Sequence, residues 1–147
     1  MVKALPRLVA VTLFALAGAS AAFAEDAPPK PMPPLQKNFP LDQTFSLREL
    51  NGKPVPASLD VSLKIDSALR GSGFGGCNSW SAVMYPVKDQ HLLVGQYALT
   101  HKQCDKDTTA IETGFLSALL GSPAWDLVNG DLVIKGPRGA LRLVRSL

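Results

Sequence analysis

The residues whose chemistry bears most directly on function are the two cysteines, Cys77 and Cys104. Oxidised, they would form a disulfide; reduced, Cys77 could serve as a nucleophile assisted by His101 or His91. With His101 and Asp105, the two thiols also supply four donor groups of the kind that bind zinc, although this spacing gives only half of the usual ligand pairs. An even number of cysteines in an exported chain favours the disulfide. We therefore predict a Cys77–Cys104 disulfide, no catalytic residue and no metal site.

A glycine-rich stretch runs directly up to Cys77. Residues 71–76 read GSGFGG and match G-x-G-x-x-G, the phosphate-binding pattern of dinucleotide enzymes. That pattern works where the glycines follow a strand and open a helix. Here a segment without helical periodicity follows and contains Pro86, so we expect no cofactor. The predicted role is a structural turn that places Cys77 beside another segment. Its residues are Gly73, Gly75, Gly76 and Asn78.

The N-terminus has the layout of a signal peptide. Lys3 and Arg7 precede an apolar run over 8–17, and Ala22-Phe23-Ala24 fits a cleavage site. The run is shorter than the roughly 20 apolar residues that span a bilayer. No cysteine lies near the site, so a lipid anchor is not expected. We predict a signal peptide over 1–24 and a periplasmic or secreted protein that does not span the membrane.

Residues 25–40 hold half of the twelve prolines, which predicts a proline-rich flexible leader. A spacer is the favoured interpretation; a ligand for an aromatic-lined groove is the alternative. Lys3 and Arg7 supply two of the three net positive charges, so the remaining chain is nearly neutral and predicts no nucleic-acid partner. Residues 41–147 are predicted to form one domain, and we expect a monomer.

Hydrophobic alternation predicts an antiparallel sheet. Residues 61–66 alternate strictly, and Asn129-Gly130 is a strong hairpin signal. Strands are expected at about 44–50, 61–66, 68–74, 81–87, 92–99, 124–128, 131–135 and 140–145. The fold class is therefore α+β: a curved, partly closed antiparallel sheet of about seven to eight strands with one helix packed on it.

The single helix is predicted over 107–120. Thr109 and Glu112 fit a capping box, in which each side chain binds the other's free backbone N–H. An apolar stripe of helical spacing follows, and Gly121 and Pro123 end the pattern. The stripe consists of Ile111, Phe115, Ala118 and Leu119.

Several pieces, in this order, resemble the META domain of HslJ-like heat-shock proteins. They are Gly76-Cys77-Asn78, the Thr100 to Cys104 segment, and Glu112 with Phe115-Leu116 and Ala118-Leu119. Phe45, Leu47 and Asn51-Gly52 match the family's opening, and Trp125, Leu127 and Leu132 match its end. The resemblance covers about residues 42–146. It implies a small α+β domain of the bacterial envelope, linked with heat shock, envelope stress and antibiotic tolerance, without a defined enzymatic activity.

Two functions remain open at this point. The first is a non-catalytic, stress-related envelope protein that binds a protein or a small molecule or has a structural role. The second is an inhibitor of a lysozyme or protease that inserts the Gly71–Trp80 loop into a cleft. A possible binding surface consists of Trp80, Tyr85 and Trp125, for which packing in the core is the alternative.

Overall fold

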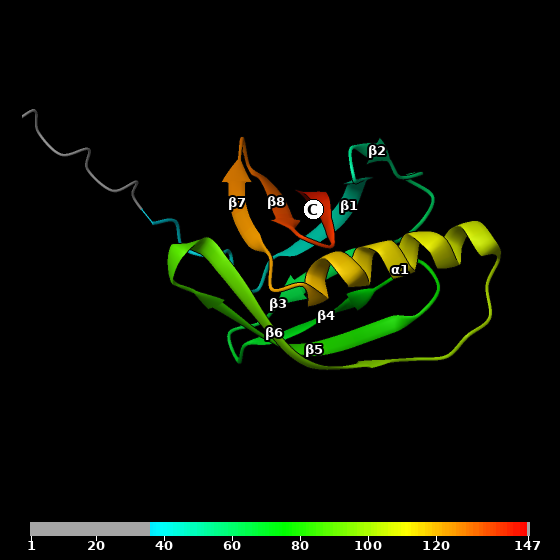
Figure 1. Ribbon diagram of the computed structural model, residues 1–147, viewed down its shortest axis with the longest axis horizontal. Coiled ribbons are helices and arrows are strands. Elements are labelled where there is room, and N and C mark those ends of the chain that lie inside the picture. Colours follow the sequence, from blue (N-terminus) through cyan, green and yellow to red (C-terminus); the bar gives the residue numbers. More distant parts are fainter. Residues whose placement is uncertain (1–35, 147) are drawn as a thin grey trace, which may run out of the picture. The chain divides into compact units, whose positions relative to one another are not determined.

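Residues 36–146 are described by a computed structural model. The predicted signal peptide and most of the leader lie outside these residues. The described part contains nine strands, one α-helix and one short 3₁₀ helix (Figure 1). The strands are β1 (Thr44–Leu50), β2 (Lys53–Pro54), β3 (Ser62–Ile65), β4 (Arg70–Phe74), β5 (Ser79–Val87), β6 (His91–Leu99), β7 (Ala124–Val128), β8 (Asp131–Gly136) and β9 (Gly139–Arg145). The helices are η1 (Lys88–Gln90) and α1 (Lys106–Leu120).

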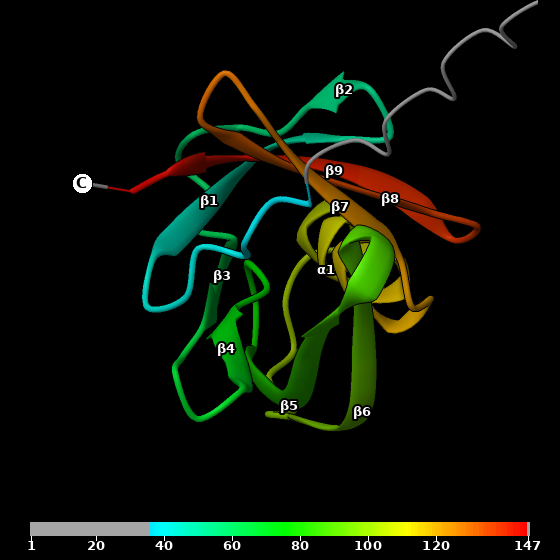
Figure 2. The same cartoon turned by 90° about the vertical axis from the view of Figure 1, so that its left-hand side faces the viewer.

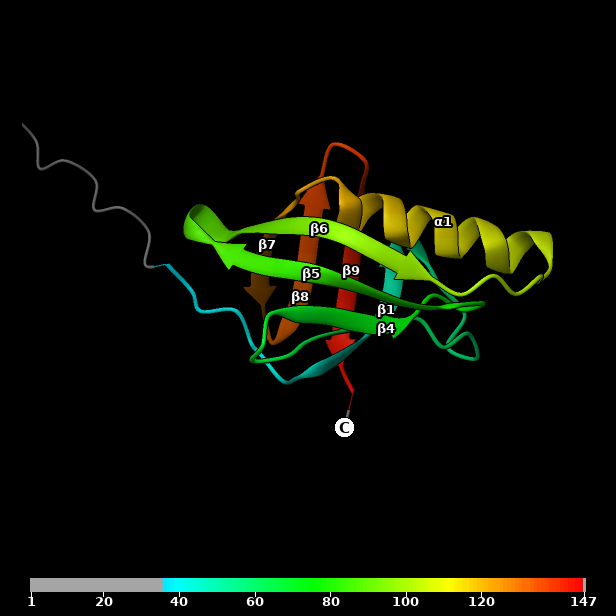
Figure 3. The same cartoon turned by 90° about the horizontal axis from the view of Figure 1, so that it is seen from below.

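The strands form one antiparallel sheet that curls back on itself. Their order is β2-β1-β3-β4-β5-β6-β7-β8-β9, and β1 also pairs with β9. On the opposite side β6 and β7 are joined only at His91 and Ala124. The sheet is therefore nearly a closed barrel with one weak seam. Figure 2 shows its curvature, and Figure 3 shows β4, β5 and β6 crossing over the strands β7, β8, β9 and β1.

The core lies between these crossing layers and beneath α1. Alternate residues of the strands point inward, as the period-two pattern requires. The fully buried large side chains include Phe45, Leu63, Ile65, Met84, Leu92, Phe115, Leu132, Ile134 and Leu143. The ring of Phe115 from α1 meets that of Trp80 from β5 edge to face, with centroids 5.9 Å apart. Burying each such side chain stabilises the fold by about 1.5–3 kcal/mol.

The predicted fold class is confirmed, with small differences in detail. The predicted strands over 44–50 and 124–128 have the observed bounds, and α1 begins one residue before the prediction. The two-residue strand β2 was not predicted, because it is too short to show alternation and contains a proline.

The predicted capping box is wrong. Asp105 is the N-cap residue of α1, and its side chain accepts hydrogen bonds from the backbone N of Thr108 (2.9 Å) and the Thr108 hydroxyl (2.6 Å). The Thr109 hydroxyl donates to the Asp105 carbonyl instead of serving as a cap acceptor. Glu112 is buried and binds a different part of the chain, as described below.

The folded part extends back to Lys37, before the predicted boundary at residue 41. The Lys37 ammonium binds a carboxylate oxygen of Asp126 and donates to the Leu127 carbonyl (2.7 Å). The Phe39 ring packs edge to face on Trp125, with centroids 5.0 Å apart. The last residues of the predicted leader therefore pack on β7. Over residues 36–146, none of the helices has the length and apolar character needed to cross a bilayer.

Candidate functional site

The two cysteines are joined to each other. The Cys77–Cys104 disulfide links the turn after β4 to the segment before α1, with Cα atoms 6.0 Å apart. Both sulfurs are used, so neither serves as a nucleophile or a zinc ligand in this form. No group of three or more His, Cys, Asp or Glu side chains within residues 36–146 is arranged to hold a metal ion.

Beside the disulfide lies a buried polar cluster, which we call the Asn78–Glu112 clamp. Glu112 of α1 accepts hydrogen bonds from the backbone N of Asn78 (2.6 Å) and from its side-chain Nδ2 (2.8 Å). The Asn78 Oδ1 accepts from the Thr100 hydroxyl (2.9 Å) and from the backbone N of Lys102 (2.6 Å). Each buried polar atom of the clamp thus has a partner, which offsets the cost of removing a carboxylate from water. The clamp ties the turn, the segment before α1 and the helix together.

The glycines let the backbone come close to this clamp. A Cβ at Gly75 would lie 2.5 Å from Oε2 of Glu112, and one at Gly73 would overlap the backbone of Ser62. Gly76 has φ +98°, a conformation that favours glycine. Gly71–Phe74 lie on β4, and the antiparallel strand β5 follows the turn instead of a helix. The glycine run thus lacks the strand–helix context of a dinucleotide site, and its glycines permit close packing.

The predicted inhibitory loop does not protrude from the molecule. Cys77, Asn78 and Trp80 are all buried, and the turn is held inward by the clamp. A segment that plugs another protein's cleft has to present exposed side chains. This geometry gives no support to the inhibitor hypothesis for Gly71–Trp80.

The three aromatic residues of the predicted binding surface do not come together on the surface. Trp80 and Trp125 are each only 4% exposed, whereas Tyr85 is 46% exposed on the outer face of β5. The Trp80 indole N–H donates to the Ser62 carbonyl at 3.2 Å. The Trp125 indole N–H is buried without a hydrogen-bond acceptor among the described residues. The two indoles therefore belong to the core, because the inward positions of β5 and β7 carry them there.

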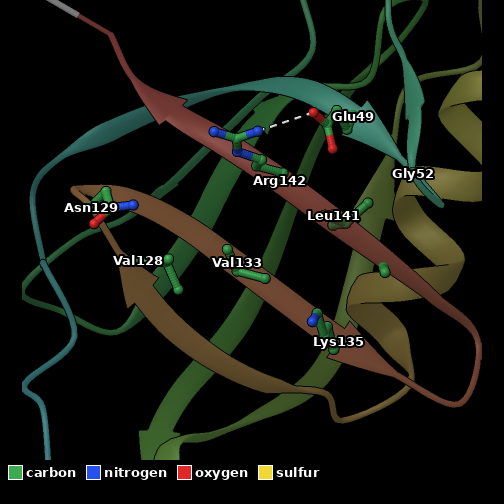
Figure 4. A pocket seen from close by; sticks show the side chains of 9 residues that line it. Glu49, Gly52, Val128, Asn129, Val133, Lys135, Leu141 and Arg142 are labelled. Carbon is green, nitrogen blue, oxygen red and sulfur yellow. Dashed lines mark hydrogen bonds and ion pairs between the residues drawn. The ribbon is translucent and has the colours of Figure 1, made fainter.

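A groove of about 470 Å³ lies on the outside of the curled sheet, over the faces of β1, β9, β8 and β7 that point away from the core (Figure 4). We call it the outer groove. Its apolar lining includes Val128, Val133 and Ala140, and the turns at Gly52 and Asn129 also line it. Charged side chains border it. The lining residues are Glu49, Gly52, Val128, Asn129, Val133, Lys135, Ala140, Leu141 and Arg142.

Ion pairs fix most of the charged side chains around the outer groove. Arg142 lies between Glu49 and Asp131, with nitrogen–oxygen distances of 3.1 and 2.8 Å. The hydrogen bond to Asp131, and secondarily the pair with Glu49, raises the pKa of Arg142. At the far side of β7, the hydrogen bond from Lys37 lowers the pKa of Asp126, aided by Gln90. All three carboxylates, those of Glu49, Asp126 and Asp131, are thus held in ion pairs.

The sequence did not indicate the outer groove. Its residues come from four strands and two turns that are distant along the chain, and none belongs to a chemical motif. One signal was present: Val133 occupies an outward position in β8, beside buried Leu132 and Ile134. An apolar residue at an outward position can mark a binding surface, but a single one is common on any protein.

Comparison with known protein families shows which family this chain belongs to. The profile of the META domain family matches residues 37–146. The chain belongs to the META domain family. The match starts at Lys37, the first residue that contacts β7, and it includes the disulfide, the clamp and the outer groove.

Two solved structures resemble this META domain. One, described as an NMR structure of a protein, superposes with a TM-score of 0.60 at 20% identity and covers 69% of this chain and 87% of its own. The other, an NMR structure of a protein from Burkholderia xenovorans, has a TM-score of 0.59 at 19% identity and covers 82% of this chain and 99% of its own. At this identity they show a shared fold. No curated protein sequence matches this chain.

Proposed function

We propose that this META domain is an exported, non-catalytic binding protein of the bacterial envelope with a role in stress, and that the outer groove is its binding site. The observation that carries the proposal is the groove itself: an apolar floor with charged borders, about 470 Å³ in volume, over strands β8 and β9, which are each paired on both sides. This volume lies within the range of about 300–1,000 Å³ that is usual for small-molecule sites.

The disulfide and the clamp support a binding role over a catalytic one. Activated nucleophiles and general bases need a free reactive atom near a cleft. Both cysteine sulfurs are bonded to each other, and both carboxylate oxygens of the buried Glu112 accept hydrogen bonds from Asn78. These groups stabilise the scaffold that presents the groove. A disulfide also favours an oxidising compartment, which agrees with the predicted export.

Photo-crosslinking in cells tests this proposal. The full gene, with p-benzoylphenylalanine in place of Val128, is expressed in its own host with and without heat stress. Val128 is 45% exposed and lines the groove. The matched control places the same probe at Leu93, which is 49% exposed on β6, away from the groove.

We expect the Val128 probe to form a discrete adduct with a partner or small molecule in the envelope fraction, and the Leu93 probe not to form it. The same adduct at both positions, or none at Val128, would contradict the proposed site. Recovery of the protein in the cytoplasm would contradict the proposed compartment.

A further inference from the structure

The outer groove contains a cation that has no acidic partner. Lys135 stands on the outer face of β8, between Ala124 of β7 and Ala140 of β9 in cross-strand register. Its neighbours on both sides are thus methyl groups. The acids of the surrounding strands are paired with other cations: Asp126 with Lys37, and both Glu49, which lines the groove, and Asp131 with Arg142. Within residues 36–146, Lys135 forms no ion pair.

An apolar path leads away from this cation. Val133 follows on the same outer face of β8, and the exposed Val128 lies at the end of β7. Figure 4 shows Val133 between Lys135 at one end of the groove and Val128 with Asn129 at the other. A second hollow of about 200 Å³ shares three lining residues with the groove, Val128, Val133 and Lys135. The arrangement is a cation at one end of a shallow apolar channel.

We propose that the outer groove binds a single-chain amphiphile with an anionic head group, such as a fatty acid or an alkyl phosphate. The head group pairs with Lys135, and the alkyl chain lies over Val133 toward Val128. This inference rests on the proposed function of the groove and adds the chemical class of its ligand. An exposed lysine alone holds an anion weakly in water, so the apolar floor supplies the remaining binding energy.

The geometry disfavours two other ligand classes. A peptide that adds a strand needs a free sheet edge, but β8 and β9 are each paired on both sides. A nucleic acid needs several unpaired cations along its phosphates, and Arg142 is held between two acids. A short anionic chain needs one cation and an apolar path, which the groove provides.

Titration of the full chain with its disulfide intact tests the inference by amide NMR. The probes are laurate, dodecyl phosphate and dodecyltrimethylammonium, each below its micelle concentration. We expect laurate and dodecyl phosphate to shift the amides of β8 and of the Asn129 turn, and the cationic probe not to do so. If only dodecyl phosphate shifts these amides, the groove selects a phosphate head group. If both probes shift them, the groove accepts either a carboxylate or a phosphate head group.

Two variants make the test specific. Lys135→Met keeps an apolar stem without the charge and should weaken laurate binding about fivefold. Lys64→Met is the control, because Lys64 also points outward from a strand and forms no ion pair within the described residues. It should bind laurate as the wild type does. Equal binding of the cationic probe, unchanged affinity in Lys135→Met, or shifts confined to the β5–β6 face would overturn the inference.

The two proposals fail separately. If the Val128 probe captures an adduct in cells and no anionic amphiphile binds the groove, the ligand class is wrong and the binding role stands. If laurate binds in a Lys135-dependent way and the Val128 probe captures nothing in cells, the groove has the inferred chemistry without the proposed cellular role.

Discussion

Removing the side chain of Asn78 should destabilise this META domain more than any single surface change. Asn78→Ala eliminates three side-chain hydrogen bonds: one to Glu112, one from the Thr100 hydroxyl and one from the backbone N of Lys102. It leaves a buried carboxylate oxygen and a backbone N–H without their partners. Each such loss costs about 1–3 kcal/mol. We expect the free energy of unfolding to fall by about 3–5 kcal/mol and Tm by about 12–20 °C.

The measurement is urea unfolding followed by tryptophan fluorescence, with the disulfide intact in every variant. Trp80 lies two residues from Asn78 and is buried, so its emission reports on this region. Ser72→Ala on the exposed side of β4 is the control and should change the free energy of unfolding by less than about 0.5 kcal/mol. Glu112→Gln should lower the free energy of unfolding by about 2 kcal/mol. Both oxygens of Glu112 accept hydrogen bonds from Asn78, so the NH₂ group of the glutamine would face one of these donors. If the free energy of unfolding of Asn78→Ala lies within about 1 kcal/mol of the wild-type value, the clamp does not hold the turn as described.

Three further predictions concern the scaffold. The double variant Cys77→Ala/Cys104→Ala should lose about 3–4 kcal/mol of unfolding free energy in urea, and a loss below about 1 kcal/mol would show that the disulfide hardly constrains the unfolded chain. Asp105→Ala should lower the free energy of unfolding at neutral pH, because it removes the N-cap of α1. Hydrogen bonds from Thr108 lower the pKa of Asp105 from its usual value, so the stabilisation should be present above that usual value and be lost as the pH falls through the lowered pKa. A urea series against pH checks this, with Asp105→Asn as the pH-independent comparison. Gly76→Ala, at φ +98° beside Leu59, should cost more in thermal unfolding than Gly52→Ala, at φ +76° in open space, and equal costs would contradict the packing role of the glycine turn.

Most of the fold could be predicted because its signals are local. The alternation in residues 61–66 and the Asn129-Gly130 turn each specify a strand or hairpin from a few neighbouring residues. The cysteine pair was predictable for a different reason: if the chain is exported, as predicted, a disulfide is the usual outcome for two cysteines. Here the sequence and the structure agree.

The role of Glu112 could not be predicted, because local and distant partners compete for one carboxylate. Thr109 and Glu112 have the spacing of a capping box, and nothing in the helix alone contradicts it. In the fold, Asn78 offers Glu112 two donors, and Asp105 already caps the helix. Tertiary packing decides between these alternatives.

The outer groove was missed for a related reason. Val133, Lys135 and Arg142 look like ordinary outward positions of strands, and only the register of β7, β8, β9 and β1 makes them neighbours. The aromatic residues were more conspicuous in the sequence, but the alternation of β5 and β7 directs both indoles into the core. The two tryptophans therefore contribute to the core, whereas the candidate site consists of ordinary outward-facing strand residues.

The claim on which the functional account depends is that the chain leaves the cytoplasm and closes its disulfide. Intact mass of the protein from the envelope fraction of its own host, without reductant and after a thiol-blocking reagent, tests both at once. The account predicts a chain that starts at Glu25 and carries no blocked thiol. A chain that retains Met1 and carries two blocked thiols would contradict it.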